Sequence, residues 1–150
     1  NYISNHEHHH FSKMALIAPA THTKYYAKIP MLLSYILPNA ILPSLNLKDY
    51  RARKYTSLAE YRFMYKIQKN ISNNHLNIPA LVILSQKDEL INTSEVIKFS
   101  KALTLWECHE VTNKDSQQIK KYHHLMITEE NLGQIEWAKM LNKMTSHFAL

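Results

Sequence analysis

Three apolar runs along the chain predict the strands of a sheet. The first is KMALIA, residues 13–18, which Pro19 ends. The second lies in IPALVILS, residues 78–85, where every position from 80 to 84 is apolar. Continuous apolarity is typical of a strand in a parallel sheet that helices cover on both faces. A third strand is expected within LTLWECHEV, residues 103–111.

Helical patterns lie before and after the second strand. Residues 57–72 repeat apolar side chains close to one face, and Ser57 with Glu60 matches the capping box that opens many helices. Asn92 and Glu95 give a similar start to another helix. The alternation of strands and helices predicts an α/β fold with a mostly parallel sheet.

Two further stretches are rich in apolar residues. Residues 29–47 are interrupted by three prolines, so one straight helix is excluded and short helical pieces with proline corners are expected. The chain closes on an amphipathic helix that is expected from about residue 129. The apolar face of this last helix consists of Trp137, Met140, Leu141, Met144 and Phe148.

The glycine content excludes several kinds of site. Gly133 is the only glycine among the 150 residues, where average usage would give about ten. Glycine lets backbone N–H groups crowd around a phosphate or an oxyanion. The chain therefore contains no P-loop, no dinucleotide-binding fingerprint and no G-x-S-x-G elbow.

Charge and cysteine content narrow the expected partners. The net charge is +6, but the basic residues are spread thinly, and the densest group is Lys48, Arg51, Arg53 and Lys54. A solvated basic face is expected rather than a nucleic-acid site. The lone Cys108 has no internal partner for a disulfide, which favours a reducing compartment, and we expect a cytoplasmic protein. No signal peptide or membrane span is visible, although a chain that starts at Asn1 is expected to lack its natural N-terminus.

Residues 6–10, HEHHH, match the H-E-x-x-H pattern of zinc metalloproteases. That pattern needs two histidines one turn apart on a stable helix and a further ligand. Here the match stands near the start of the chain and a predicted strand follows it almost at once. We therefore expect no functional metal site and no cofactor, only adventitious metal binding by His6, His8 and His10.

Two polar stretches are expected at the edge where the strands end. SQKDELI, residues 85–91, follows the buried strand, and YHHLMI, residues 122–127, follows the third strand and its loop. Ligands of open α/β sheets bind beyond the carboxyl ends of the strands. One stretch offers a carboxylate there and the other an imidazole.

These stretches resemble a known superfamily. IPALVILSQKDELI is similar to the penultimate strand and acid loop of α/β-hydrolases, and YHHLMITEENLG to their histidine loop. The monoacylglycerol-lipase and lysophospholipase-like serine hydrolases are the branch that it resembles most. The resemblance implies one partial domain over residues 1–150, the C-terminal half of the fold, with a helical lid insertion at residues 19–77.

The resemblance also implies roles for individual residues. Asp88 matches the acid of a catalytic triad and Glu89, its nearest substitute, is expected to point to solvent. His123 matches the general base, with His124 as the alternative. Met31, Leu33 and Leu37 of the insertion are candidates for binding an ester or lipid substrate, although core packing is an alternative, and the insertion is a candidate for transient contact with a membrane surface.

The chain departs from the family pattern at one decisive point. The nucleophile elbow and the oxyanion loop precede KMALIA in this superfamily, and neither is present. We therefore expect a serine-hydrolase fragment that is inactive alone. A degenerate remnant, or a non-catalytic module that binds through its basic surface, is the alternative, and the sequence leaves the oligomeric state open.

Overall fold

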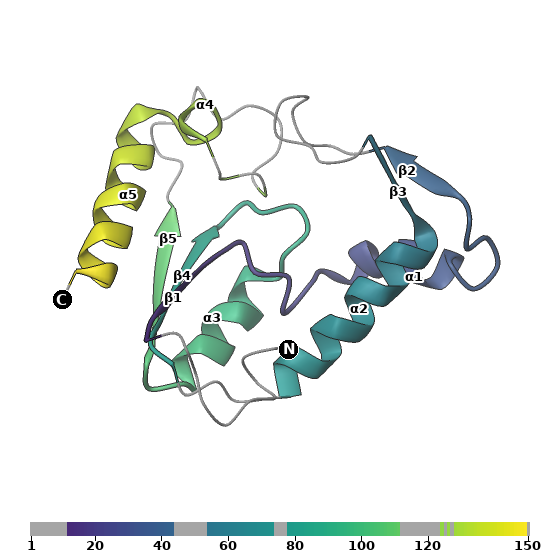
Figure 1. The fold of residues 1–150 in the computed structure, drawn as a ribbon, viewed down its shortest axis with the longest axis horizontal. Helices are drawn as coiled ribbons and strands as arrows, with labels where there is room; N and C mark the ends of the chain where they lie inside the picture. The colour runs from purple at the N-terminus through teal and green to yellow at the C-terminus, as the bar shows by residue number, and fades with distance from the viewer. Residues whose placement is uncertain are drawn as a thin grey trace.

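The computed structural model describes residues 12–43, 54–73, 78–111, 124, 126 and 128–149. Its centre is a parallel sheet of three strands in the order β1-β4-β5 (Figure 1). The strands are β1, Met14–Ile17; β4, Ala80–Ser85; and β5, Trp106–Val111. All three strands predicted from the apolar runs are confirmed, and so is their parallel arrangement.

The middle strand explains the continuous apolar run. Every residue of β4 is buried, because alternate side chains enter two different cores. Leu81 and Ile83 pack into one cluster with Met140, whereas Val82 and Leu84 enter the cluster on the opposite face. Each face of the sheet therefore has its own hydrophobic core.

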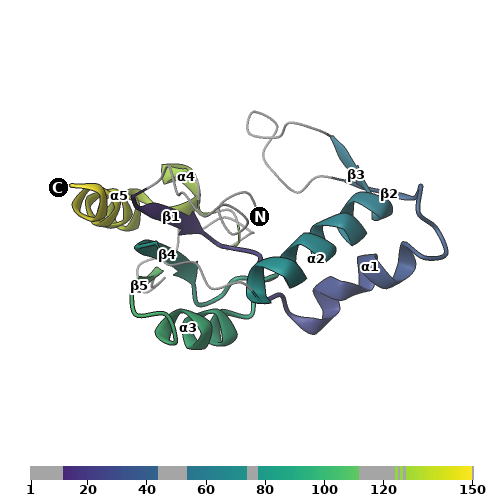
Figure 2. The ribbon, with the colours of Figure 1, turned by 60° about the horizontal axis from the view of Figure 1, so that its bottom comes forward.

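One helix layer covers each face of the sheet, as Figure 2 shows. α3, Thr93–Lys101, packs on the face of Val82, and the Asn92 side chain caps it by accepting from the Glu95 backbone N–H at 3.5 Å. On the other face lie α4, Glu129–Leu132, and α5, Gln134–Phe148.

The C-terminal helix expected from about residue 129 is present, but it is divided into α4 and α5. Gly133 separates α4 from α5 with φ 79° and ψ 154°, a conformation that residues with a Cβ avoid. The expected apolar face is also narrower than predicted. Met140 is buried and Trp137 and Met144 pack on the core, whereas Leu141 and Phe148 remain exposed.

The residues between β1 and β4 form a second group of elements beside the sheet (Figure 2). The group contains the 3-10 helix η2, Tyr25–Lys28; α1, Ile29–Leu33; β2, Ile41–Pro43; β3, Tyr55–Ser57; and α2, Leu58–Asn73. α1 packs against α2. We call residues 19–77 the insertion, whose boundaries stay a prediction from the resemblance.

The start of α2 follows the predicted capping box. The Ser57 N–H donates to Glu60 Oε2 at 2.7 Å, and the Glu60 N–H donates to Ser57 Oγ at 3.2 Å. The prediction of helical pieces over residues 29–47 is right for α1 but wrong for residues 41–43. These residues pair as β2 with β3 in antiparallel register, Ile41 opposite Ser57.

The histidine-rich segment and three of the four residues of the basic group, residues 48, 51 and 53, lie outside the described residues. Among the described residues, no three or more His, Cys, Asp or Glu side chains gather into a group that could hold a metal. Within the same part of the chain, no helix combines the length and apolarity needed to cross a membrane.

Candidate active site

Asp88 lies at the carboxyl end of β4, in the acid loop, residues 86–92. Its side chain is fully buried, and the loop wraps around it. Asp88 Oδ1 accepts hydrogen bonds from the backbone N–H groups of Leu90 and Ile91, each at 2.8 Å. The Asp88 N–H donates to the Ser85 carbonyl oxygen at 3.1 Å, which closes the turn after the strand. The loop backbone therefore fixes the position of the carboxylate.

The other carboxylate oxygen meets an imidazole from a distant part of the chain. His124 Nδ1 lies 2.9 Å from Asp88 Oδ2, although the two residues are 36 positions apart. The His124 backbone N–H donates to Glu89 Oε2 at 3.0 Å. The prediction that Glu89 points to solvent is therefore wrong, because its carboxylate holds the histidine segment beside the acid loop.

The pKa of Asp88 indicates where the proton lies between Asp88 and His124. Burial alone would raise the pKa of the Asp88 carboxyl, but the hydrogen bonds from His124, Ile91 and Leu90 outweigh burial and lower that pKa below its ordinary value. Asp88 is therefore ionised at neutral pH and can only accept hydrogen bonds. His124 Nδ1 must carry the proton between them, which leaves Nε2 of a neutral imidazole as the proton acceptor.

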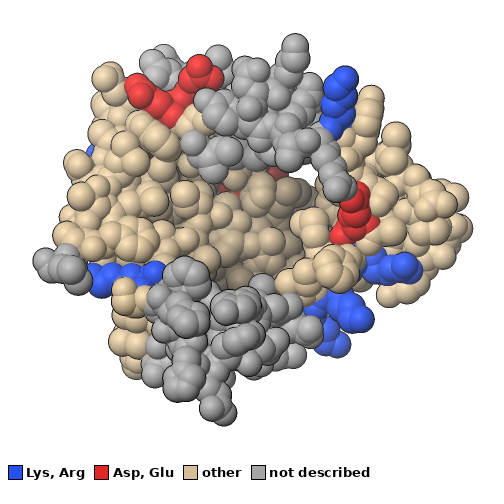
Figure 3. All heavy atoms as spheres, in the orientation of Figure 1, with Lys and Arg blue, Asp and Glu red and all other residues tan. Residues whose placement is uncertain are grey.

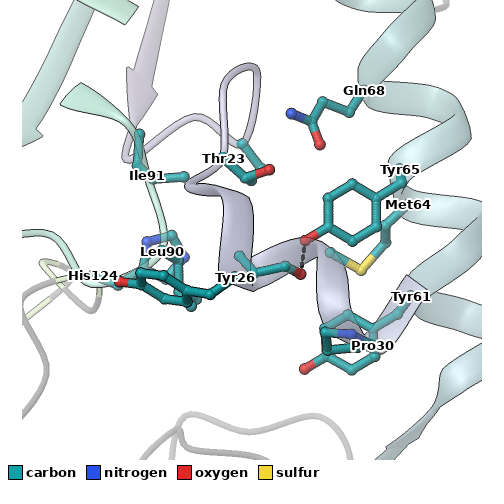
Figure 4. A pocket seen from close by; sticks show the side chains of 12 residues that line it. Thr23, Tyr26, Pro30, Tyr61, Met64, Tyr65, Gln68, Leu90, Ile91 and His124 are labelled. Atoms are coloured by element: carbon teal, nitrogen blue, oxygen red, sulfur yellow. Dashed lines mark hydrogen bonds between the residues drawn. The ribbon is translucent and has the colours of Figure 1, made fainter. Parts of the chain in front are cut away.

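A cavity of about 270 Å³ reaches His124. Its walls come from residues 20–30, from α2, and from Leu90 and Ile91 of the acid loop. Figure 4 shows His124, Leu90 and Ile91 on one side, and Tyr61, Met64 and Tyr65 facing them from α2. Figure 3 shows this face of the molecule hollowed between the sheet and the insertion.

Two hydrogen bonds within the insertion hold together the elements that form this side of the cavity. The Tyr65 hydroxyl donates to the Ala27 carbonyl oxygen, and Gln68 Nε2 donates to the Thr21 carbonyl oxygen at 2.9 Å. These two bonds tie α2 to the segment that leaves β1. The cavity beside His124 is thus lined mostly by apolar side chains, and hydrogen bonds fix the elements that carry them.

Comparison with known proteins bears on the fold. No protein-family model matches the chain, and no curated protein matches its sequence. The structure is similar to a soluble variant of monoglyceride lipase from Saccharomyces cerevisiae, solved with a substrate analogue, with a TM-score of 0.57. The fold is a partial α/β-hydrolase fold. Identity is 12%, and the similarity covers 87% of this chain and 54% of the lipase chain, about half of its length.

The Asp88–His124 pair lies at the edge of the sheet where the parallel strands end. Asp88 follows the central strand, and His124 returns from beyond β5 to the same edge. Carboxyl ends of parallel strands are where open α/β sheets place their ligands. The Asp88 carboxylate and the imidazole of His124, which the sequence offered as the alternative to His123, are therefore in contact in the folded chain.

The remaining predicted site residues have different outcomes. His123, the predicted base, lies outside the described residues. Met31, Leu33 and Leu37 do not line the cavity at His124: Met31 is half-buried, and the other two are exposed. Their role in substrate binding stays a prediction.

The residues that line the cavity on the side of α2 were missed. Tyr61, Met64 and Tyr65 fall on the periodic apolar face of residues 57–72, which the sequence marked as helical but not as a cavity wall. Periodicity tells which face of a helix is covered, and not whether a protein core or a cavity lies against it. Tyr26, which also lines the cavity, belongs to no periodic apolar pattern in the sequence that could have indicated it.

Proposed function

We propose that this chain is the C-terminal part of a serine hydrolase of the carboxylesterase or lipase class, and that it supplies the acid and the base of a Ser–His–Asp triad. The observation that carries the proposal is the 2.9 Å contact between Asp88 Oδ2 and His124 Nδ1. In such a triad, the acid holds the imidazole through one ring nitrogen, and the other nitrogen takes the proton of the serine.

The chemistry follows from the proton positions. A serine hydroxyl attacks the ester carbonyl, and its proton passes to His124 Nε2. The imidazolium is stabilised by the buried Asp88 carboxylate and then gives the proton to the leaving alcohol. In the second half, His124 takes a proton from water and the hydroxide adds to the acyl carbon. The bond to the serine oxygen then breaks, and His124 Nε2 returns the proton to that oxygen, which releases the carboxylic acid and restores the serine.

The serine and the oxyanion donors are proposed to come from polypeptide outside these 150 residues. No serine of the chain stands in G-x-S-x-G. The only glycine, Gly133, occupies the junction of α4 and α5. The chain alone is therefore proposed to be inactive as a hydrolase, because Asp88 and His124 have no nucleophile to activate.

The substrate is proposed to be a small ester or lipid with an apolar part. The cavity at His124 has apolar walls, and its volume of about 270 Å³ lies near the lower end of common ligand pockets. Contact with a lipid surface fits the insertion, which exposes several large apolar side chains. They include Tyr25, Ile29, Leu32, Tyr35, Ile36 and Leu37.

The assignment of the base differs from the expectation from sequence. His124 is proposed as the base because it lies within hydrogen-bond distance of the acid and also lines the cavity. His123 was favoured only by the family pattern, and it serves as the matched comparison in the test below.

The test is labelling of the full-length natural protein with a fluorophosphonate probe, which reacts with activated serines. Asp88→Asn and His124→Ala should each slow labelling by roughly 10⁴-fold or more. Lys87→Gln, at an exposed position of the acid loop, and His123→Ala are the controls and should label at close to the normal rate. Undiminished labelling of Asp88→Asn and His124→Ala would overturn the proposal, and loss only in His123→Ala would move the base to that residue.

Lipid contact is tested by sedimentation of the protein with lipid vesicles. The double variant Tyr25→Ser/Ile36→Ser removes two of the most exposed apolar side chains of the insertion, 84% and 78% exposed. It should lose most of its binding. Ile135→Ser/Phe148→Ser, with the change on exposed positions of α5, is the control. Equal loss in both double variants would argue against the insertion as the contact surface.

A further inference from the structure

The first residues of the insertion are bonded directly to the acid loop. Lys24 Nζ donates to the Asp88 carbonyl oxygen at 2.6 Å, and the Lys24 backbone N–H donates to the Leu90 carbonyl oxygen at 2.8 Å. The Tyr26 hydroxyl donates to the Glu89 carbonyl oxygen. Three consecutive carbonyl groups of the acid loop are therefore held by one short segment.

The backbone completes this attachment. Thr23 and Ile91 form an isolated antiparallel bridge, and the Asn92 N–H donates to the His22 carbonyl oxygen at 2.8 Å. Residues 22–26 thus run along the outside of residues 88–92. On the inside of the same loop, the Asp88 carboxylate accepts from Leu90 and Ile91. The loop is held from both sides.

Of these three bonds to the loop carbonyls, the one from Lys24 Nζ has a charged donor, whereas the other two donors are a backbone N–H and a hydroxyl. Hydrogen bonds with a charged partner are shorter and stronger than neutral ones. A carbonyl oxygen fixed on Asp88 itself restricts rotation of the peptide unit next to the carboxylate. The direction of the carboxylate toward His124 therefore depends on where Lys24 holds that peptide.

We infer that Lys24 is a positioning residue, whose ammonium group on the Asp88 carbonyl oxygen holds the carboxylate in line with His124. The segment that carries it also lines the cavity through Thr23, Tyr26 and Ala27. The segment that holds the acid loop is therefore also part of the cavity wall. The inference rests on the proposed function only for its consequence in catalysis, because the positioning itself is a property of this chain.

The test uses the 150-residue chain, with Lys24→Met as the main variant. Its readouts are amide hydrogen exchange at Leu90 and Ile91, and the low-field NMR signal of the His124 ring proton that bonds to Asp88. Loss of a hydrogen bond with a charged partner should speed exchange of these two amides by about tenfold or more. The ring-proton signal should broaden or disappear.

Three further variants separate positioning from general destabilisation. Lys24→Arg keeps a charged donor and should restore most of the protection. Lys28→Met removes an exposed cation from η2, the 3-10 helix that directly follows Lys24, and should leave both readouts unchanged. Tyr26→Phe removes one hydroxyl contact without a change of charge and should give a smaller rise at the same amides.

The outcomes decide the inference. Unchanged exchange in Lys24→Met, or no recovery in Lys24→Arg, would overturn it. An equal rise at the buried β4 amides of Val82 and Leu84 would also overturn it, because the effect would then be loss of the whole fold. A positive result together with failed fluorophosphonate labelling of the full-length protein would keep the inference and reject the hydrolase proposal.

Discussion

Replacement of Asp88 by asparagine tests how much the buried carboxylate stabilises the fold. In Asp88→Asn, the amide oxygen can still accept from the N–H groups of Leu90 and Ile91. The amide N–H₂ group then faces the ring N–H of His124, so the third hydrogen bond is lost or needs the other histidine tautomer. One hydrogen bond with a charged partner is worth about 1.5–3 kcal/mol.

The assay is urea unfolding at pH 7, followed by the fluorescence of the two tryptophans. With a slope of about 2 kcal/mol per molar urea, the midpoint of Asp88→Asn should fall by about 1 M. Lys87→Gln is the control. Its side chain is exposed in the same loop, and the change in stability should stay within about 0.5 kcal/mol.

The pH dependence of the same experiment has a definite sign. The pKa of Asp88 is lowered in the folded chain from its ordinary value of 3.8. Its contribution to stability is therefore complete above pH 3.8 and is lost as the pH falls further, through the lowered pKa of the folded state. The gap between Asp88 and the asparagine variant should narrow in that range. Equal stability at pH 7, or a gap that stays constant in acid, would refute the reasoning.

Three other substitutions probe the frame around the site. Gly133→Ala places a Cβ at φ 79° and should lower stability in thermal unfolding by about 1–3 kcal/mol; an unchanged melting temperature would contradict the junction described. Ser57→Ala removes the cap of α2 and should cost about 1 kcal/mol in urea unfolding, with Ala59→Ser as a control for a change outside the cap. Leu81→Ala empties part of a core that is fully buried and should cost about 2–5 kcal/mol in urea unfolding; a loss below that range would mean that β4 is not central.

The strands and the helix starts could be predicted from sequence because their signals are local. The continuous apolar run at positions 80–84 is typical of a strand whose two faces are both covered. The capping box joins Ser57 to Glu60, which are within one turn of helix of each other. β2 was missed for the opposite reason. Its residues 41–43 carry no alternation, and they form a strand only because β3 lies opposite them.

The sequence allowed us to predict at which edge of the sheet the candidate site lies, but not which atoms are hydrogen-bonded there. The position of Asp88 after a buried strand follows from topology. Nothing in the pattern of residues 85–91 shows that Glu89 bonds to the His124 backbone, or that Lys24 reaches the Asp88 carbonyl. Such contacts join segments far apart in the chain, and single-sequence patterns carry no information on them.

The two connections within the sheet differ greatly in length. α3 joins β4 to β5 with a short crossover, whereas the stretch between Ile17 and Ala80 joins β1 to β4. Each doubling in the length of a flexible loop adds only about 0.6 kcal/mol to the cost of closing it. A change in the length of a flexible part of this connection therefore adds little to the cost of closing it, provided that residues 22–26 are retained. Evolution or a protein engineer can exchange the far wall of the cavity as a module, while the carboxylate and imidazole stay where they are.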